Sequence, residues 1–281
     1  MTEQSWRVAL ITTVPPVAAF MTAALRELGH DPVAIITARR KEPIPDQPRM
    51  SDETAPAGLD VLLARDKWSI EPLLRAYRPD LALCWGFPWK VPKAALDVPR
   101  FGSVNCHPAL LPRHRGPIPM AWAFRDGDEQ FGVTWHRMDS ELDTGPILAQ
   151  ATVPMEDDDF EIMVVGPRIG AVAIGLLPQM LSRIASGDPG DPQPGEGVTW
   201  AGHFGDDYAE VDWSQPARRI HDQVRAWAFT FGFSPVVGPI ATIDGRRVRV
   251  TRTSLVDPGG EARRVETGDG PLWVVSSEPV G

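Results

Sequence analysis

Asn105 and His107 are the residues of this 281-residue chain whose types and spacing point most directly to catalysis. They close the run 103–107, which we interpret as a strand. Side chains two positions apart on a strand project from one face, so an amide and an imidazole are expected side by side. In an open α/β sheet, ligands bind beyond the carboxyl ends of the strands. Cys106, between the two, is expected to face the other way and to pack in the core.

A carboxylate follows downstream, in the turn Asp143-Thr144-Gly145. Asp143 could simply form the turn, but near His107 it would orient the imidazole and stabilise its protonated form. The three residues then supply the parts of an acyl-transfer site. His107 moves protons, with an ordinary pKa near roughly 6.5, and the Asn105 amide donates to an oxyanion. No Ser or Cys nucleophile is required if the acyl group passes directly to an amine.

The elements that must position these residues alternate short apolar runs with amphipathic segments. We predict strands at 6–13, 32–37, 81–87, 103–107, 132–138 and 147–155. We predict helices at 17–28, 70–77 and 159–186. Short buried strands separated by helices favour an α/β, Rossmann-like, mostly parallel sheet with helices on both faces. The polar stretch 39–58 is expected to be a long loop.

The Pro- and Gly-rich stretch that begins at residue 187 is the best linker candidate. We therefore expect a catalytic domain at 1–186, a linker at 187–210 and a C-terminal domain at 211–281. Residues 214–227 predict a helix, and the pattern from 239 onward is all-β, with Asp244-Gly245 at the turn of a hairpin.

Composition and charge exclude several classes of protein. The net charge of −9 argues against a protein dominated by contacts to a phosphate backbone. Two cysteines exclude a disulfide framework and a four-cysteine zinc site, and they fit the cytoplasm. We predict no metal site. The apolar run 169–181 is too short for a membrane span, so no membrane partner is expected. Glycine-rich nucleotide-binding loops and a Gly-x-Ser-x-Gly turn are absent. The oligomeric state is not indicated.

Three motifs together resemble the 10-formyltetrahydrofolate-dependent formyltransferase family. They are Asn105-Cys106-His107, the loop Leu110-Leu111-Pro112-Arg113-His114-Arg115-Gly116, and Asp143-Thr144-Gly145. Residues 211–227 and the stretch GDGPLWVV also resemble the C-terminal domain of methionyl-tRNA formyltransferases. The resemblance implies a Rossmann-like catalytic domain followed by a small, here shortened, open-barrel (OB-like) domain.

The resemblance also implies site residues and a co-substrate. Asn105, His107 and Asp143 would be catalytic, and 10-formyltetrahydrofolate would supply the formyl group without a metal. Eight residues would contact the folate: Trp85, Gly86, Phe87, Pro88, Leu110, Arg115, Asp139 and Thr144. We interpret His136, which alternates with Trp135 along its strand, as a structural histidine whose hydrogen bonds are satisfied.

The acceptor is the least determined part of the prediction. Acidic residues in the 39–58 loop, a short C-terminal barrel and a weak net charge of +2 from residue 213 onward favour the amine of a small metabolite over tRNA. Such an acceptor, an amino sugar, an ornithine-type amine or a peptide precursor, would indicate secondary metabolism. The alternatives are methionyl-tRNA formylation, hydrolysis of 10-formyltetrahydrofolate with water as acceptor, and folate binding without catalysis.

Overall fold

The computed structural model of the chain describes residues 5–38, 49–51, 53–231 and 234–280. The described residues form two compact units. Unit 1 draws on residues 1–115, 132–152 and 168–199, and unit 2 draws on residues 116–131, 153–167 and 200–281. The domain limits expected at residues 186 and 210 stay a prediction.

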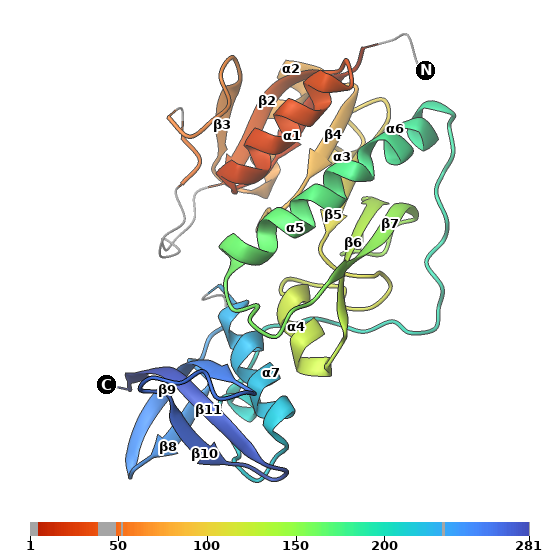
Figure 1. Ribbon diagram of the computed structural model, residues 1–281. Helices are drawn as coiled ribbons and strands as arrows, with labels where there is room; N and C mark the ends of the chain where they lie inside the picture. Colours follow the sequence, from red (N-terminus) through yellow and green to blue (C-terminus); the bar gives the residue numbers. More distant parts are fainter. Residues whose placement is uncertain (1–4, 39–48, 52, 232–233, 281) are drawn as a thin grey trace. The chain divides into compact units, whose positions relative to one another are not determined.

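A seven-stranded sheet carries the candidate site (Figure 1), with the strand order β3-β2-β1-β4-β5-β6-β7. The strands are β1 (Arg7–Ile11), β2 (Asp31–Ala38), β3 (Asp60–Ala64), β4 (Leu81–Cys84), β5 (Ser103–His107), β6 (Gln130–Arg137) and β7 (Ile147–Pro154). Neighbouring strands from β3 to β5 are parallel, and β6 runs antiparallel to β5. The predicted Rossmann-like, mostly parallel sheet is confirmed.

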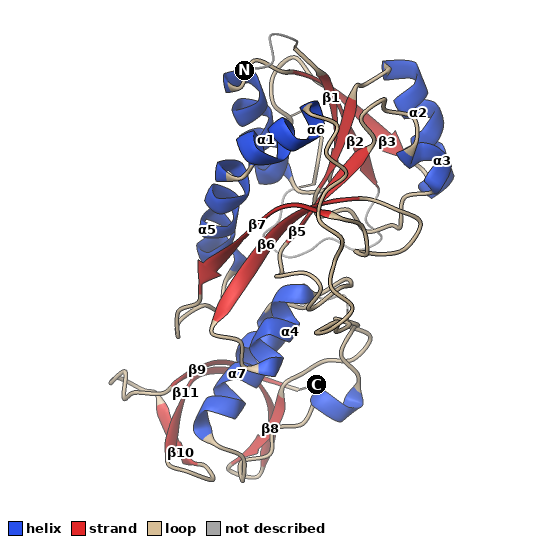
Figure 2. Ribbon diagram, turned by 90° about the vertical axis from the view of Figure 1, so that its right-hand side faces the viewer, coloured by secondary structure: helices blue, strands red, loops and turns tan. Residues whose placement is uncertain are grey.

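Helices cover both faces of this sheet, as Figure 2 shows. Helices α1 and α6 lie with α5 on one face, and α2 and α3 lie on the other. Their bounds are α1 (Pro15–Glu27), α2 (Ile70–Tyr77), α3 (Lys93–Leu96), α5 (Ile162–Gly175) and α6 (Leu177–Ala185), and a 3-10 turn, η1 (Lys67–Ser69), precedes α2. On the first face, the Trp135 indole donates a hydrogen bond to the Ala173 carbonyl of α5 at 2.9 Å.

Strand β3 was not predicted from the sequence. It is an edge strand, and only its last residue, Ala64, is buried, while Leu63 remains 52 % exposed. Its apolar residues therefore follow neither the alternation of a half-buried strand nor the continuous burial of an internal one. In the expected loop 39–58, residues 39–48 and residue 52 lie outside the described residues.

Unit 2 contains a curled four-stranded antiparallel sheet with the order β10-β11-β9-β8. Its elements are α4 (Pro119–Asp126), η2 (Asp206–Tyr208), α7 (Ala217–Ala228), β8 (Ile240–Ile243), β9 (Arg246–Ser254), β10 (Arg263–Glu266) and β11 (Pro271–Pro279). Val224 of α7 packs in one core with Val250 and Val274 of the sheet. Asp244 and Gly245 both have positive φ, as the predicted hairpin turn requires. The half-barrel character expected of the C-terminal region is confirmed.

Residues 162–185 contain a longer apolar helical run than the sequence suggested. By length and composition this one run, α5 followed by α6, could cross a membrane, with a mean hydropathy of 1.5. A core helix of a soluble protein passes the same test. Pro167 lies inside α5, Leu176 separates α5 from α6, and Gly170 packs against Phe20 of α1.

Candidate active site

The end of β5 carries the first two predicted site residues. Asn105 lies opposite His136 of β6, and His107 lies opposite Thr134, so the alternation along the strand puts both on one face. His107 is only 4 % exposed, and Asn105 is half-buried. Cys106 is buried between them, which confirms its predicted place in the core.

The turn between β6 and β7 brings Asp143 to this pair. Its Oδ1 accepts a hydrogen bond from Asn105 Nδ2 at 3.3 Å, and its Oδ2 lies 3.6 Å from His107 Nδ1. Gly145 permits this turn because a Cβ at that position would lie 1.9 Å from the Arg137 carbonyl oxygen. Three residues that are up to 38 positions apart in the sequence are thus gathered in one buried cluster.

The surroundings of His107 decide which of its ring nitrogens can take a proton. Nε2 lies 2.8 Å from the His114 carbonyl oxygen. A carbonyl only accepts, so Nε2 carries a hydrogen and Nδ1 is the basic nitrogen of the neutral ring. Burial lowers the pKa of His107, while the Asp143 carboxylate and the His114 carbonyl act in the opposite direction. A neutral base therefore faces Asp143 at neutral pH.

His136, interpreted from the sequence as a hydrogen-bonded structural histidine, contacts the same cluster. Its Nδ1 donates to the Arg137 carbonyl oxygen at 2.9 Å, so its Nε2 is an acceptor. That Nε2 lies 3.2 Å from Asn105 Nδ2 and 3.5 Å from Asp143 Oδ1. The Asn105 amide nitrogen therefore has two partners, His136 Nε2 and Asp143 Oδ1. Only the pairing of β5 with β6 reveals this contact.

The loop after β5 folds back over β6. Thr134 Oγ1 donates to the Ala109 carbonyl oxygen at 2.6 Å. Gly132 approaches the loop so closely that a Cβ there would lie 2.2 Å from the Leu110 nitrogen. These contacts fix the course of the loop toward His114, which is itself buried. The carbonyl that orients His107 is thereby held in place.

Residues 187–199, which fall within the linker expected from the sequence, run along unit 1 beside the cluster, and we call them the strap. Gln193 Nε2 donates to the Asp143 carbonyl oxygen at 2.9 Å. Thr199 Oγ1 accepts from the His114 backbone nitrogen at 2.8 Å. Sequence reasoning missed both residues, because an amide and a hydroxyl in a proline-rich stretch carry no signal of a long-range contact.

Eight residues are expected to contact the folate. Four of them come immediately after β4 in the sequence: Trp85, Gly86, Phe87 and Pro88. They leave the sheet next to the cluster of Asn105, His107 and Asp143, because Cys84 of β4 pairs with Asn105 of β5. Trp85 contacts Trp135 edge-on, with 6.2 Å between the ring centroids, and lines a narrow apolar cavity with Leu10 and Met21. The contacts of this segment with folate stay a prediction.

The other four lie around the Asp143 turn and the loop after β5: Leu110, Arg115, Asp139 and Thr144. Asp139 Oδ1 accepts from Thr144 Oγ1 at 2.7 Å, which closes the turn that holds Asp143. Arg115 Nε and Nη2 both donate to Gln193 Oε1, at 3.0 and 2.6 Å. Their contacts with folate also stay a prediction.

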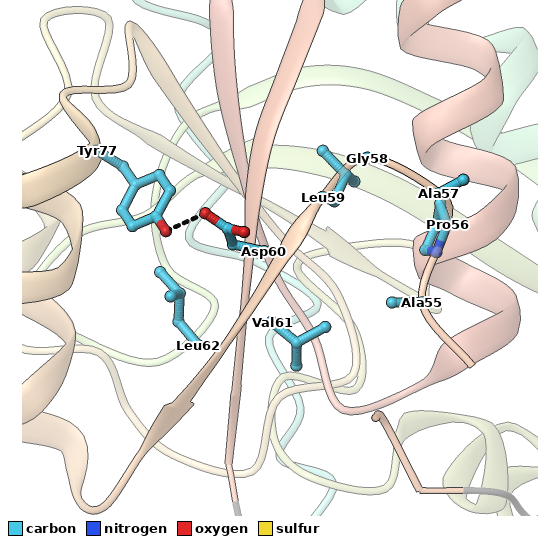
Figure 3. A pocket seen from close by; sticks show the side chains of 9 residues that line it. All are labelled: Ala55, Pro56, Ala57, Gly58, Leu59, Asp60, Val61, Leu62 and Tyr77. Carbon is cyan, nitrogen blue, oxygen red and sulfur yellow. Dashed lines mark hydrogen bonds between the residues drawn. The ribbon is translucent and has the colours of Figure 1, made fainter. Parts of the chain in front are cut away.

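A separate hollow lies at the edge of the sheet in unit 1 (Figure 3). Residues 55–62 and Tyr77 line it, and the Tyr77 hydroxyl donates to Asp60 Oδ2 at 2.5 Å. None of the predicted catalytic residues lines it. Its side chains include neither an imidazole nor a side-chain amide, and its carboxylate and hydroxyl are hydrogen-bonded to each other.

Chemically, the cluster combines a neutral imidazole, an amide N–H donor and a carboxylate at the carboxyl edge of the sheet. Burial raises the pKa of the Cys84 thiol to about 12 and that of Cys106 well above its ordinary range, so neither is a ready nucleophile. Among the described residues, no group of three or more His, Cys, Asp or Glu side chains is placed to hold a metal ion. The fold is thus α/β, and the cluster supplies a base, a donor and a carboxylate of the kinds that acyl transfer requires.

Comparison with known proteins gives the family. Residues 8–166 match the formyl transferase family, and residues 206–280 match the formyl transferase C-terminal domain. The chain is 31 % identical to methionyl-tRNA formyltransferase of Myxococcus xanthus, over 95 % of this chain and 88 % of that protein. The chain therefore belongs to the 10-formyltetrahydrofolate-dependent formyltransferases, as its motifs predicted.

Two solved structures share the fold. HypX from Aquifex aeolicus in complex with tetrahydrofolic acid has a TM-score of 0.67 at 18 % identity, over 98 % of this chain and 44 % of HypX. The present chain thus spans less than half of the HypX length. WlaRD, a sugar 3N-formyl transferase whose structure was determined in the presence of dTDP and 5-N-formyl-THF, has a TM-score of 0.66 at 14 % identity over 99 % of both chains.

Proposed function

We propose that this enzyme transfers the formyl group of 10-formyltetrahydrofolate to the amine of a small metabolite, with Asn105, His107 and Asp143 as catalytic residues. The acceptor amine attacks the formyl carbon, the bond from that carbon to N10 of the folate breaks, and N10 leaves with a proton. The products are the formamide and tetrahydrofolate. The amine loses one proton and N10 gains one, so a single base that returns its proton balances the reaction.

His107 is suited to carry that proton. Its Nε2 is committed to the His114 carbonyl, which leaves Nδ1 as the base. A proton on Nδ1 faces Asp143 Oδ2, 3.6 Å away, and forms an ion pair with it. Asn105 donates to the oxyanion of the tetrahedral intermediate in place of one of its present partners. In this mechanism no covalent acyl-enzyme intermediate is formed.

The charge arrangement of the C-terminal region carries the proposal for a small acceptor. From residue 213 onward the chain has nine arginines and no lysine. Seven of these arginines lie within 4.0 Å of a carboxylate. The pairs are Arg218 with Asp157, Arg225 with Asp222, Arg247 with Glu210, Arg249 with Glu278, Arg252 with Glu161, Arg263 with Asp244, and Arg264 with Glu266.

Such pairing disfavours a phosphate-binding role. An arginine that binds a phosphate has to leave its carboxylate, and the carboxylate then repels the same phosphate. Arg219, one of the other two, donates to the Arg125 carbonyl oxygen. A C-terminal region whose arginines are mostly paired with carboxylates is poorly suited to hold tRNA, whereas a small amine makes no such demand. The fold of WlaRD supports the proposal insofar as a protein of this architecture formylates a sugar amine.

Methionyl-tRNA formylation is the second candidate. The Myxococcus xanthus relative carries that name, and its alignment extends over 95 % of the present chain. The two functions make different demands on the same residues, because tRNA has to displace arginine–carboxylate pairs and a small amine does not.

Acceptor discrimination with one donor tests the proposal. The protein is incubated with 10-formyltetrahydrofolate and either methionyl-tRNA or a panel of amino sugars, ornithine-type amines and amino acids. Tetrahydrofolate release and the mass of the formylated product are followed. Formylation of a small amine, with methionyl-tRNA unmodified, is the expected result. Formylation of methionyl-tRNA, at rates that fall steeply as the salt concentration rises, would refute the small-amine proposal and support the second candidate. Formate release without any acceptor would identify a hydrolase.

A further inference from the structure

The strap is attached to unit 1 before it reaches the cluster. Arg183 of α6 pairs with Asp188 at 2.7 Å and with Asp191 at 2.8 Å. Arg137, at the end of β6, donates to the Asp188 carbonyl oxygen at 2.9 Å. Asp191 and Ile147 of β7 exchange two backbone hydrogen bonds of 2.8 Å each. The segment is thus fixed to the sheet two residues before Gln193.

Gln193 then uses its whole hydrogen-bonding capacity on two parts of the site. Its Nε2 donates to the carbonyl oxygens of Asp143 at 2.9 Å and Gly145 at 2.8 Å. Its Oε1 accepts from Nε and Nη2 of Arg115 at 3.0 and 2.6 Å. A side-chain amide has two donor hydrogens and two acceptor lone pairs, and all four are occupied here. Both contacts lie within unit 1.

The backbone around Gln193 limits its freedom. Pro192 precedes it and Pro194 follows it. A proline fixes its own φ and restricts the residue before it to extended conformations. The amide is therefore presented from a stiff segment rather than from a flexible linker.

Asp143 is a residue that needs such support. Its φ is +57°, in the left-handed region that is unfavourable for a residue with a side chain, although Asp tolerates it better than most. The carbonyl groups on both sides of Thr144 are the ones that Gln193 holds. Fixing these two peptide planes fixes the direction in which the Asp143 side chain leaves the backbone.

We propose that Gln193 is a positioning residue that holds the Asp143 carboxylate against His107 and couples it to the Arg115 guanidinium. The proposal rests on the catalytic roles proposed above for Asp143 and His107. It differs from a purely structural role, in which Gln193 would only dock the strap, because it requires that loss of Gln193 change the electrostatic environment of His107.

Three variants separate these roles. Gln193→Met keeps the length of the side chain and removes all four hydrogen bonds. Gln193→Glu keeps the acceptor for Arg115 and removes the two donors to the Asp143 turn. Glu196→Gln, an exchange of carboxylate and amide at an exposed position of the same strap, is the matched control. Both Gln193 variants are expected to lower kcat about 10- to 100-fold, because misplacement of a catalytic group by about 1 Å can cost about 100-fold in rate.

The direct readout is the titration of His107, followed by NMR of histidine-labelled protein. The groups that face His107 are Asp143, His136 of β6 and His114 of the loop after β5. Gln193→Met changes none of them chemically. Asp143 raises the pKa of His107, so displacing the carboxylate in Gln193→Met should lower that pKa. Asp143→Asn, which removes the carboxylate charge, should lower it too and serves as the reference. Glu196→Gln should titrate like the wild type.

The outcomes distinguish this inference from the function on which it rests. A His107 pKa in folded Gln193→Met equal to that of the wild type, with a lower value in Asp143→Asn, would overturn the positioning role and leave the proposed catalytic residues intact. An unchanged pKa in Asp143→Asn would instead refute the coupling of Asp143 to His107. If Gln193→Met does not fold, kcat of Gln193→Glu decides, and a wild-type kcat there refutes the positioning role.

Discussion

The cluster at the end of β5 and the C-terminal sheet differ in the burial and in the pairing of their charged side chains. In the cluster, one carboxylate lies among two imidazoles and an amide, all buried or half-buried. On the C-terminal sheet, exposed arginines are matched with exposed carboxylates. A buried charge strongly shifts the pKa values of the neutral groups around it. An exposed ion pair is largely neutralised by its own members and is screened by salt. Burial, rather than the number of charged residues, distinguishes the reactive region.

Removing the base is the strongest test of this contrast. His107→Ala is expected to lower kcat for formyl transfer by about 10³- to 10⁴-fold, at the upper end of what general acid–base catalysis contributes. Steady-state kinetics with the identified acceptor measure the effect. His203→Ala, which removes an exposed histidine, is the control and should retain wild-type rates. A His107→Ala enzyme within tenfold of the wild type would show that another group moves the proton.

Asn105→Ala should have the next largest effect on the reaction. Loss of an oxyanion donor costs about 10²- to 10³-fold in kcat. The loss should appear in kcat rather than in KM for either substrate, because the bond strengthens only as the oxyanion forms. Asn105→Asp has nearly the same size but no N–H donor, so it should be equally impaired. A fully active Asn105→Asp would contradict the oxyanion role.

A buried histidine of unit 2, His221, tests burial by itself. His221 Nε2 donates to the Asp157 carbonyl and its Nδ1 accepts from Thr253. Burial and the Arg225 cation lower its pKa to about 4. The unfolded chain therefore binds a proton more readily, so this contribution to stability is complete above about pH 6.5 and is lost as the pH falls toward 4.

The expected loss is about 3 kcal/mol, at 1.36 kcal/mol for each pKa unit. Urea unfolding of the wild type and of His221→Gln between pH 7 and 4 measures it. The glutamine variant cannot take up the proton, so its stability should fall by about 3 kcal/mol less over this range. Equal pH dependence in the two proteins would mean that His221 does not titrate as its burial implies.

The pH profile of catalysis is a finer probe of the cluster. In the proposed mechanism His107 is a neutral base, and burial lowers its pKa, so the acid limb of kcat/KM should lie below the ordinary histidine value. In Asp143→Asn the residual activity should show an acid limb at still lower pH, because the carboxylate that favours the imidazolium is gone. An acid limb that moves upward in this variant would contradict the assignment.

The smallest effect is expected on the C-terminal sheet. Arg247→Gln breaks the exposed pair with Glu210, and an exposed ion pair contributes little to stability. Transfer to a small amine should change less than about twofold. If tRNA is the acceptor, the same variant should weaken binding and reduce the salt dependence by about one unit of slope. That result would remove the contrast between the two regions.

The sequence by itself determined the chemistry and most of the framework. Apolar runs and turn residues identified the parallel sheet and the Asp244-Gly245 hairpin, because burial and turn geometry restrict residue choice locally. The two-residue spacing of Asn105 and His107 put them on one face before any strand pairing was known. Strand β3 was not predicted, because a largely exposed edge strand has no such apolar pattern.

Only the tertiary structure decided which residues surround this chemistry. His136 meets Asn105 through the antiparallel pairing of β5 with β6. Gln193 meets Asp143 from 50 residues away, through a segment whose composition suggests a linker. The arginines of the C-terminal sheet find carboxylates on other strands and loops. Contacts of this kind depend on how distant segments are brought together, and the types of the residues along the chain do not specify that.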